Sequence, residues 1–146
     1  MPGSDRGPGG DLYVRAIDDL VDGRHRNGLH RLAVDRPAAD VAGTVGAAGW
    51  RTFAVTVDAS TTKGGVLAAL AAAAGFPEWV GPNWDGLQDA LRDLSWAPAD
   101  GFVALIDGWD DFAVAQPLDA AVLGSVLAES ARWWAEAGTP FHVLLR

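Results

Sequence analysis

Residues 102–106 read Phe102-Val103-Ala104-Leu105-Ile106, five apolar residues in succession. A strand with one face in water alternates apolar and polar residues, so this unbroken run is typical of a strand that is covered on both faces. Trp50–Asp58 alternates apolar with smaller side chains and is rich in β-branched residues, which predicts a second strand. Phe141–Leu145 is a further apolar segment and predicts a final strand.

Helical patterns lie between these strands. The Ala-rich segment Lys63–Ala74 follows a threonine cap and precedes Gly75, which predicts a helix there. Asn83 is a good N-cap for a helix over Trp84–Leu94. A long helix is predicted from Pro117 to about residue 137, and its inward-facing residues are expected to be Leu118, Val122, Val126, Leu127, Ala131 and Trp134.

Strands that alternate with helices predict right-handed β-α-β crossovers and therefore an α/β fold, with a small parallel sheet and helices packed around it. Before residue 50 the pattern is weaker. Residues 1–10 contain four Gly and two Pro and are predicted to be a disordered leader. We then expect a helix that Asp11 caps and that runs to Asp22, a strand over Gly28–Val34 and a helix that begins at Pro37.

These patterns predict three segments along the chain. After the leader, residues 11–49 are expected to form an N-terminal β-α extension that packs on the core, and residues 50–146 are expected to form the main domain. The leader lacks the basic start and apolar run of a signal peptide, and the longest apolar run covers only Val66–Ala74. A bilayer span needs about 20 apolar residues, so we expect a cytoplasmic protein without a membrane segment.

The charge of the chain is concentrated in one stretch. The 146 residues carry a formal net charge of −8, and residues 78–111, with eight carboxylates and Arg92 alone, account for −7 of it. A negative domain repels phosphates, so direct binding of DNA or RNA is not expected, whereas a basic protein partner is favoured.

Several kinds of catalytic or metal site are excluded by the sequence. There is no cysteine, and therefore no disulfide, thiol nucleophile or Cys-ligated zinc. No phosphate-binding glycine loop, G-x-S-x-G or H-E-x-x-H motif is present. His25, His30 and His142 lack the spacing of metal ligands, and His142 is expected to have a structural role in the last strand.

The carboxylates of the predicted helix over residues 84–94 form a stripe. Asp85, Asp89 and Asp93 are spaced at i, i+4 and i+8, so they share one face. The opposite face is expected to pack on the core through Trp84, Leu87, Leu91 and Leu94. Like charges at this spacing repel by a few tenths of a kcal/mol per pair, and only the first-turn aspartate is favoured by the helix dipole.

Three interpretations of the stripe remain open. The first is an ordinary solvated acidic face. The second is a metal-dependent enzyme in which Asp85 and Asp89 act with Asp107, which follows the central apolar strand. The third is a docking surface for a basic protein, and three tryptophans favour it because aromatic residues are enriched at interface centres. These tryptophans, which could equally pack in the core, are Trp79, Trp84 and Trp96.

The run Phe76-Pro77-Glu78-Trp79-Val80-Gly81-Pro82-Asn83-Trp84-Asp85-Gly86-Leu87-Gln88-Asp89-Ala90-Leu91 resembles the hallmark of the barstar family of ribonuclease inhibitors. The order of predicted elements also agrees from about residue 50 to the C-terminus. The resemblance implies a three-layer α/β fold with a parallel sheet. It further implies a cytoplasmic, non-catalytic inhibitor without cofactor or metal, monomeric when free, that forms a 1:1 complex with a secreted basic ribonuclease of the barnase type, which prefers guanyl sites.

The resemblance also implies roles for individual residues. Asp89 would take the place of an RNA phosphate in the active site of the enzyme, Asp85 would pair with basic residues at its rim, and Trp79 would contact the enzyme. Gly81 would let the backbone approach closely, and Asn83 would cap the helix at the interface. The remaining residues of the expected partner-binding set are Trp84, Gln88 and Asp93.

Some positions depart from the family pattern. Gln88 replaces an aromatic contact, Arg92 and Asp93 replace small residues, and Trp133 takes the place of an acidic residue on the last long helix. These changes leave the acidic stripe intact, but they leave open which ribonuclease is the target. A regulatory module of the same fold that binds another basic protein is therefore the further alternative.

Overall fold

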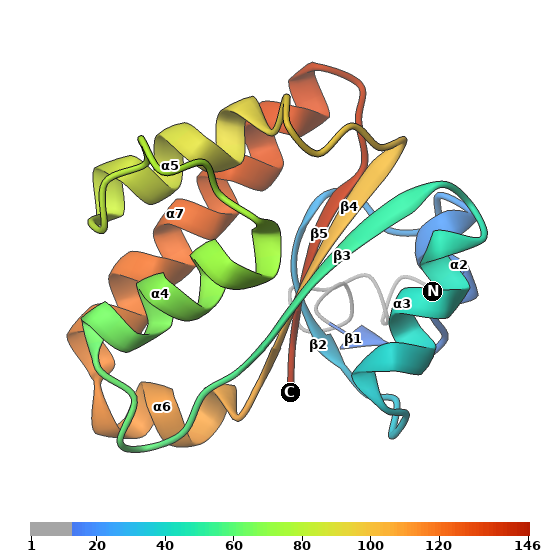
Figure 1. Cartoon of the computed structure of the whole chain (residues 1–146). Helices are drawn as coiled ribbons and strands as arrows, with labels where there is room; N and C mark the ends of the chain where they lie inside the picture. The colour runs from blue at the N-terminus through green and yellow to red at the C-terminus, as the bar shows by residue number, and fades with distance from the viewer. Residues whose placement is uncertain (1–12) are drawn as a thin grey trace.

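The central apolar run forms a buried strand, as predicted. In the computed structural model, which describes residues 13–146, β4 (Gly101–Asp107) lies inside a five-stranded sheet (Figure 1). Residues 101–106 are all buried. The strand order is β1-β2-β5-β4-β3 and every pair is parallel, with β3 (Trp50–Thr56) on one side of β4 and β5 (Phe141–Leu145) on the other. The predicted parallel α/β sheet is confirmed.

Helices cover both faces of the sheet, so the fold has three layers (Figure 1). Phe102, Ala104 and Ile106 pack in the larger core, beneath α4 (Lys63–Ala74), α5 (Trp84–Asp93), α6 (Trp109–Ala115) and α7 (Pro117–Glu136). Val103 and Leu105 point to the smaller core, beneath α2 (Asp18–Val21) and α3 (Ala38–Gly46). The alternation explains why the strand needs apolar residues at every position.

The N-terminal region differs from its prediction. Tyr13 and Val14 form a short edge strand, β1, instead of part of a helix, and they pair with the end of β2 (Gly28–Leu32). Of the helix that was expected to run to Asp22, only α2 forms, because Tyr13 and Val14 pair with β2 in the sheet. The expected cap Asp11 and the expected leader, residues 1–10, lie outside the described residues. The strand after Gly28 and the helix after Pro37 are present.

Two details of the C-terminal region were not predicted correctly. Leu118 and Val122 of α7, expected to face inward, are 82% and 39% exposed. The buried face instead follows Ala120, Leu123, Leu127 and Ala131, because the Ala-rich sequence offers more than one apolar stripe. The pattern also gave no sign of α6, a short helix that follows Gly108. Gly108 has φ +83° and its Cα lies so close to the Val57 carbonyl that a Cβ would clash with it, so the chain turns tightly there.

Strand β2 joins the N-terminal segment to the rest of the sheet. It pairs with β5 over four residues, from Gly28–His142 to Arg31–Leu145. At the end of the chain, Arg146 donates to the Val34 carbonyl at 2.7 Å and to the Asp107 carboxylate at 2.5 Å. Among the described residues, none of the helices is both long and apolar enough to cross a membrane.

Candidate functional site: the acidic helix and its loop

The loop that leads to α5 is held by aromatic contacts. α4 ends at Gly75, whose left-handed conformation (φ 66°) turns the chain back. Phe76 and Trp79 then meet Trp96 edge to face, with ring centroids 5.8 and 6.0 Å apart. The Trp96 indole N–H donates to the Ala74 carbonyl at 3.3 Å. Trp79 is therefore held by Trp96 while 65% of its surface is exposed, which is unusual for a side chain of this size.

Asn83 begins α5 as predicted. Its backbone is extended, and its side-chain oxygen accepts a hydrogen bond of 2.7 Å from the Gly86 N–H. Gly86 must be glycine, because a Cβ there would lie 2.2 Å from the Gly81 carbonyl oxygen. At Gly81 itself a Cβ would meet the Asn83 amide at 2.9 Å. The role that the resemblance implies for Gly81, a close approach of the backbone to the enzyme, stays a prediction, and Gly86 was overlooked although it lies inside the quoted motif.

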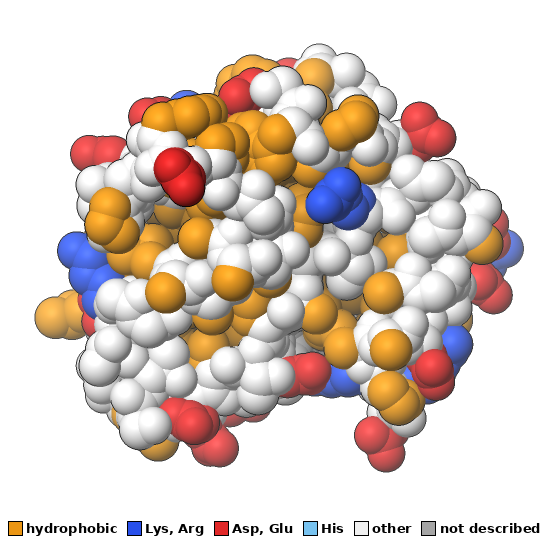
Figure 2. Space-filling view, in the orientation of Figure 1, with side chains coloured by type: hydrophobic (Ala, Val, Ile, Leu, Met, Phe, Trp, Pro, Cys, Tyr) orange, Lys and Arg blue, Asp and Glu red, His pale blue; other side chains and the backbone are white. Residues whose placement is uncertain are grey.

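The two faces of α5 have opposite character. Leu87, Ala90 and Leu91 are buried, whereas Asp85, Asp89 and Asp93 are exposed. Within residues 13–146, no cation forms an ion pair with any of these three carboxylates. In Figure 2, carboxylates and exposed hydrophobic side chains occur together on the side of the molecule where Figure 1 shows α5. The predicted stripe is thus present and its negative charge is uncompensated.

Contacts to the neighbouring helices fix the position of α5. The Trp134 indole N–H of α7 donates to the Leu91 carbonyl at 2.7 Å, and the Gln88 amide donates to the Glu129 carboxylate at 2.7 Å. Trp84 is half-buried, and the Lys63 ammonium of α4 lies 5.6 Å from its ring centroid. Trp84 and Gln88, both expected in the partner-binding set, are therefore also structural contacts within the chain.

Trp133 lies beside this surface. It is 41% exposed and, together with Arg92, Glu129, Arg132 and Glu136, lines a hollow of about 340 Å³ between α5 and α7. Glu129 is also 3.8 Å from Arg92, so this hollow is more neutral than the stripe. Trp133 and the exposed Trp79 therefore lie near opposite ends of the segment that contains α5, and Trp133 borders this helix through Arg92.

The metal-dependent alternative finds no support in the geometry. Asp107, the third carboxylate of that hypothesis, pairs with Arg146 at 2.5 Å at the end of β4. Among residues 13–146, no three His, Asp or Glu side chains are placed so that they could hold one metal ion. The surface of α5 can therefore offer charge and shape to a partner, and the described residues assemble no metal-binding group there.

One cluster was missed by sequence reasoning. The fold brings His142 next to His25 and His30, with ring centroids of His30 at 5.3 Å from His25 and 5.2 Å from His142. His142 is buried, as its structural role requires. The only signal for this cluster would have been the pairing of the strand after Gly28 with the last strand, which the sequence does not reveal.

Comparison with known protein families gives one match. A family model described as Barstar (barnase inhibitor) matches residues 50–146, about two-thirds of the chain. The match begins at β3 and includes the whole loop and α5 described above. No curated protein matches the chain significantly.

Proposed function

We propose that this chain, which belongs to the barstar family, inhibits a secreted, basic, guanyl-preferring ribonuclease of the barnase type by covering its active site with α5 and the preceding loop. The observation that carries the proposal is the stripe of Asp85, Asp89 and Asp93, exposed and without cations on a helix that is fixed in place. A ribonuclease site is basic because it binds phosphates, and a row of carboxylates complements it.

Within this surface, Asp89 would occupy the place of a phosphate at the centre, and Asp85 would pair with basic residues at the rim. Asp93 would extend the stripe, and Gln88 would contact the enzyme from the edge facing α7. A central charge that is fully desolvated in the complex contributes most to an interface, whereas charges at the rim mainly increase the association rate.

The loop would supply the shape of the interface. Trp79, exposed and held by Trp96, is suited to act as an aromatic anchor. Gly81 and Asn83 would set the close approach of the backbone at the start of α5, and Trp84 would support the helix from behind. Because these elements are fixed by contacts within the chain, little conformational entropy would be lost on binding.

The remaining features follow from this proposal. The protein would be cytoplasmic, where it protects the producing cell, and would be a monomer that forms a 1:1 complex without cofactor or catalysis. Residues 50–146 would be the inhibitory domain, and residues 11–49 an extension packed on it. The family is one of inhibitors, and nothing in the described geometry calls for an enzymatic role.

The experiment is an affinity capture from the secreted proteins of the producing organism, followed by assay of the captured protein. The proposal predicts a basic ribonuclease whose activity falls to zero at one molar equivalent of the chain. Its association rate should decrease as salt is raised from 50 to 500 mM, because salt screens the charges that steer the encounter. Capture of a basic protein without ribonuclease activity would instead favour the regulatory alternative.

A further inference from the structure

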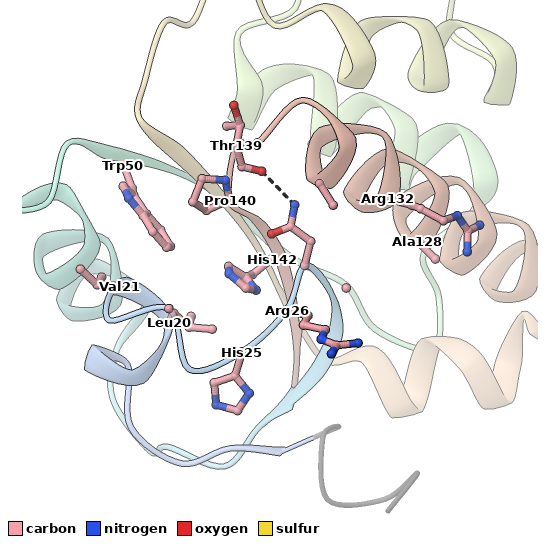
Figure 3. Close-up of a pocket in the computed structure, with 15 residues that line it drawn as sticks. Leu20, Val21, His25, Arg26, Trp50, Ala128, Arg132, Thr139, Pro140 and His142 are labelled. Atoms are coloured by element: carbon pink, nitrogen blue, oxygen red, sulfur yellow. Dashed lines mark hydrogen bonds between the residues drawn. The ribbon is translucent and has the colours of Figure 1, made fainter. Parts of the chain in front are cut away.

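A cavity lies on the side of the molecule where the segment before residue 50 meets the rest of the chain. Its volume is about 750 Å³, within the range of sites for small molecules. Part of its lining comes from the end of α2 and the loop to β2, and includes His25 and Arg26. The rest comes from the start of β3, the end of α7 and the start of β5, and includes Trp50 and Arg132 (Figure 3). Because the family match begins at Trp50, the first part of the lining lies outside the matched residues.

The charge of this cavity is opposite to that of the protein. The chain as a whole has 19 Asp and Glu against 11 Lys and Arg, yet not one carboxylate is among the described residues that line the cavity. Two arginines line it, Arg26 and Arg132, and neither forms an ion pair within residues 13–146. Four of the other described arginines form ion pairs, for example Arg31 with Asp110 at 2.7 Å, whereas Arg15, Arg36 and Arg51 do not. Two uncompensated guanidinium groups in an acidic protein favour an anionic ligand.

The floor of the cavity is aromatic. The Trp50 ring lies across Gly101, where a Cβ would be 2.6 Å from the indole, and it stacks on His142 with 14° between the ring planes. His142 in turn hydrogen-bonds His30 through ring nitrogens 3.0 Å apart. Burial, and then the facing His30 and His25, lower the pKa of His142 to about 3, so its ring is neutral. His142 therefore adds no positive charge to the cavity, whereas Arg26 and Arg132 do.

The walls are held together before any ligand arrives. The Asn27 amide donates to the Ala131 carbonyl at 3.1 Å and to the Thr139 carbonyl at 2.9 Å, which ties the loop before β2 to the end of α7. In Figure 3, Trp50 lies on one side of the cavity and Arg26 and Arg132 lie on the other, with the Asn27 to Thr139 hydrogen bond drawn between them. The cavity thus has an aromatic end and a cationic end.

We propose that this cavity binds a small organic anion that has a flat ring, with the ring near Trp50 and the anionic group at Arg26 and Arg132. Guanidinium groups recognise carboxylate and phosphate through paired hydrogen bonds, and the apolar walls, which include Leu20 and Pro140, accommodate the body of the ligand. Nucleoside monophosphates and aromatic carboxylates share this chemistry. No residue of α5 lines the cavity, although Arg132 also borders the hollow between α5 and α7, and the proposal does not depend on the proposed inhibition.

The test is calorimetric titration of the full chain with four probes: adenosine 5′-monophosphate, indole-3-acetate, adenosine and inorganic phosphate. The proposal predicts saturable binding of at least one of the two ring-bearing anions, and binding at least about tenfold weaker for adenosine and for phosphate alone, since each lacks one half of the recognition. The tighter of the two anions identifies whether the ligand carries phosphate or carboxylate.

Variants locate the site. Arg26→Ala and Arg132→Ala should each weaken binding about tenfold, the loss expected for one hydrogen bond to a charged group. Arg24→Ala is the matched control, because Arg24 is on the same loop but pairs with Asp19 at 3.6 Å and does not line the cavity. The proposal is overturned if neither ring-bearing anion binds below 5 mM, or if Arg24→Ala weakens binding as much as Arg26→Ala.

Discussion

The acidic surface of α5 and the cavity between the N-terminal segment and the end of α7 are opposites in charge and in construction. On α5, a single helix displays three carboxylates outward that form no ion pair within residues 13–146. In the cavity, Arg26 and Arg132, more than 100 residues apart in the chain, line a hollow to which the described residues contribute no carboxylate. The two regions thus present charges of opposite sign.

This separation indicates what each region can bind. A convex row of negative charges repels small anions and suits a large basic surface, which can cover the whole row at once. A concave cationic hollow suits a small anion that can enter it. Residues 78–111, which include the first region, carry −7 of the net charge of −8, so the composition of a chain can hide a second site of opposite sign.

The largest expected effect is a loss of inhibition caused by a substitution in the acidic region alone. Asp89→Ala should weaken ribonuclease inhibition at least ~30-fold, corresponding to about 2 kcal/mol, because a central charge in an interface behaves as a hot spot. Asp110→Ala is the control, since Asp110 is exposed on α6 and already pairs with Arg31. Inhibition constants measured for both variants check this, and equal small effects would remove Asp89 from its assigned role. Binding of ring-bearing anions should be unchanged in both.

The next largest effect is a pH dependence of stability that arises from His142 at the floor of the cavity. The pKa of His142 is about 3 in the folded protein and 6.5 when unfolded, so the unfolded chain takes up a proton first as the pH falls. This residue's contribution to stability is complete above pH 6.5 and decreases below it. We expect a loss of about 2 kcal/mol in the free energy of unfolding between pH 6.5 and pH 5. Urea titrations at the two pH values measure it.

The control for this prediction is His142→Gln, which keeps a polar side chain but does not titrate. The variant should lose less stability than the wild type over the same interval, whatever its stability at pH 7. A wild-type free energy of unfolding that stays constant down to pH 5 would contradict the assignment of a neutral, buried His142.

A smaller effect separates the contribution of a helix cap to stability from the contribution of α5 to recognition of the ribonuclease. Asn83→Ala removes the cap of α5 and should lower the free energy of unfolding by about 1 kcal/mol. Thr62→Ala removes the equivalent cap of α4, where Thr62 accepts from the Gly65 N–H at 3.1 Å, and should cost a similar amount. Only Asn83→Ala should also weaken inhibition. Thermal unfolding together with inhibition constants for both variants would test this, and an equal loss of inhibition would mean that helix stability alone matters.

The smallest effect concerns the two ends of the stripe. Asp93 lies in the last turn of α5, where a negative charge opposes the helix dipole and repels Asp89, so Asp93→Asn should raise stability by about 0.3 kcal/mol. Asp85 lies in the first turn, where the dipole favours it, and Asp85→Asn should not stabilise the protein. Both changes should slow association with the ribonuclease. Stabilities measured by chemical denaturation would contradict this account if both variants changed in the same direction.

The sequence was most informative where the interactions are local. The buried strand at residues 102–106, the cap at Asn83 and the stripe on α5 each depend on residues close together in the chain, and all three are present in the structure. Residues 79–93 could therefore be predicted as one surface. Their recognition of a partner stays a prediction, because it depends on a molecule outside the chain.

Features that depend on tertiary packing could not be predicted. Tyr13 and Val14 join the sheet only because β2 offers them an edge, and α6 forms where the chain turns at Gly108 beside Val57. The histidine cluster and the cavity around it arise from the pairing of β2 with β5 and from the position of the end of α7. No periodicity or spacing in the sequence encodes those neighbours.

Hydrogen exchange of the chain, measured alone and with the ribonuclease, tests most directly the claim that α5 and its loop cover the active site. The account predicts slower exchange for amides of residues 79–93 in the complex and unchanged exchange for residues 23–30 and 139–142 around the cavity. Protection confined to the cavity segments, with α5 exchanging as in the free protein, would contradict it.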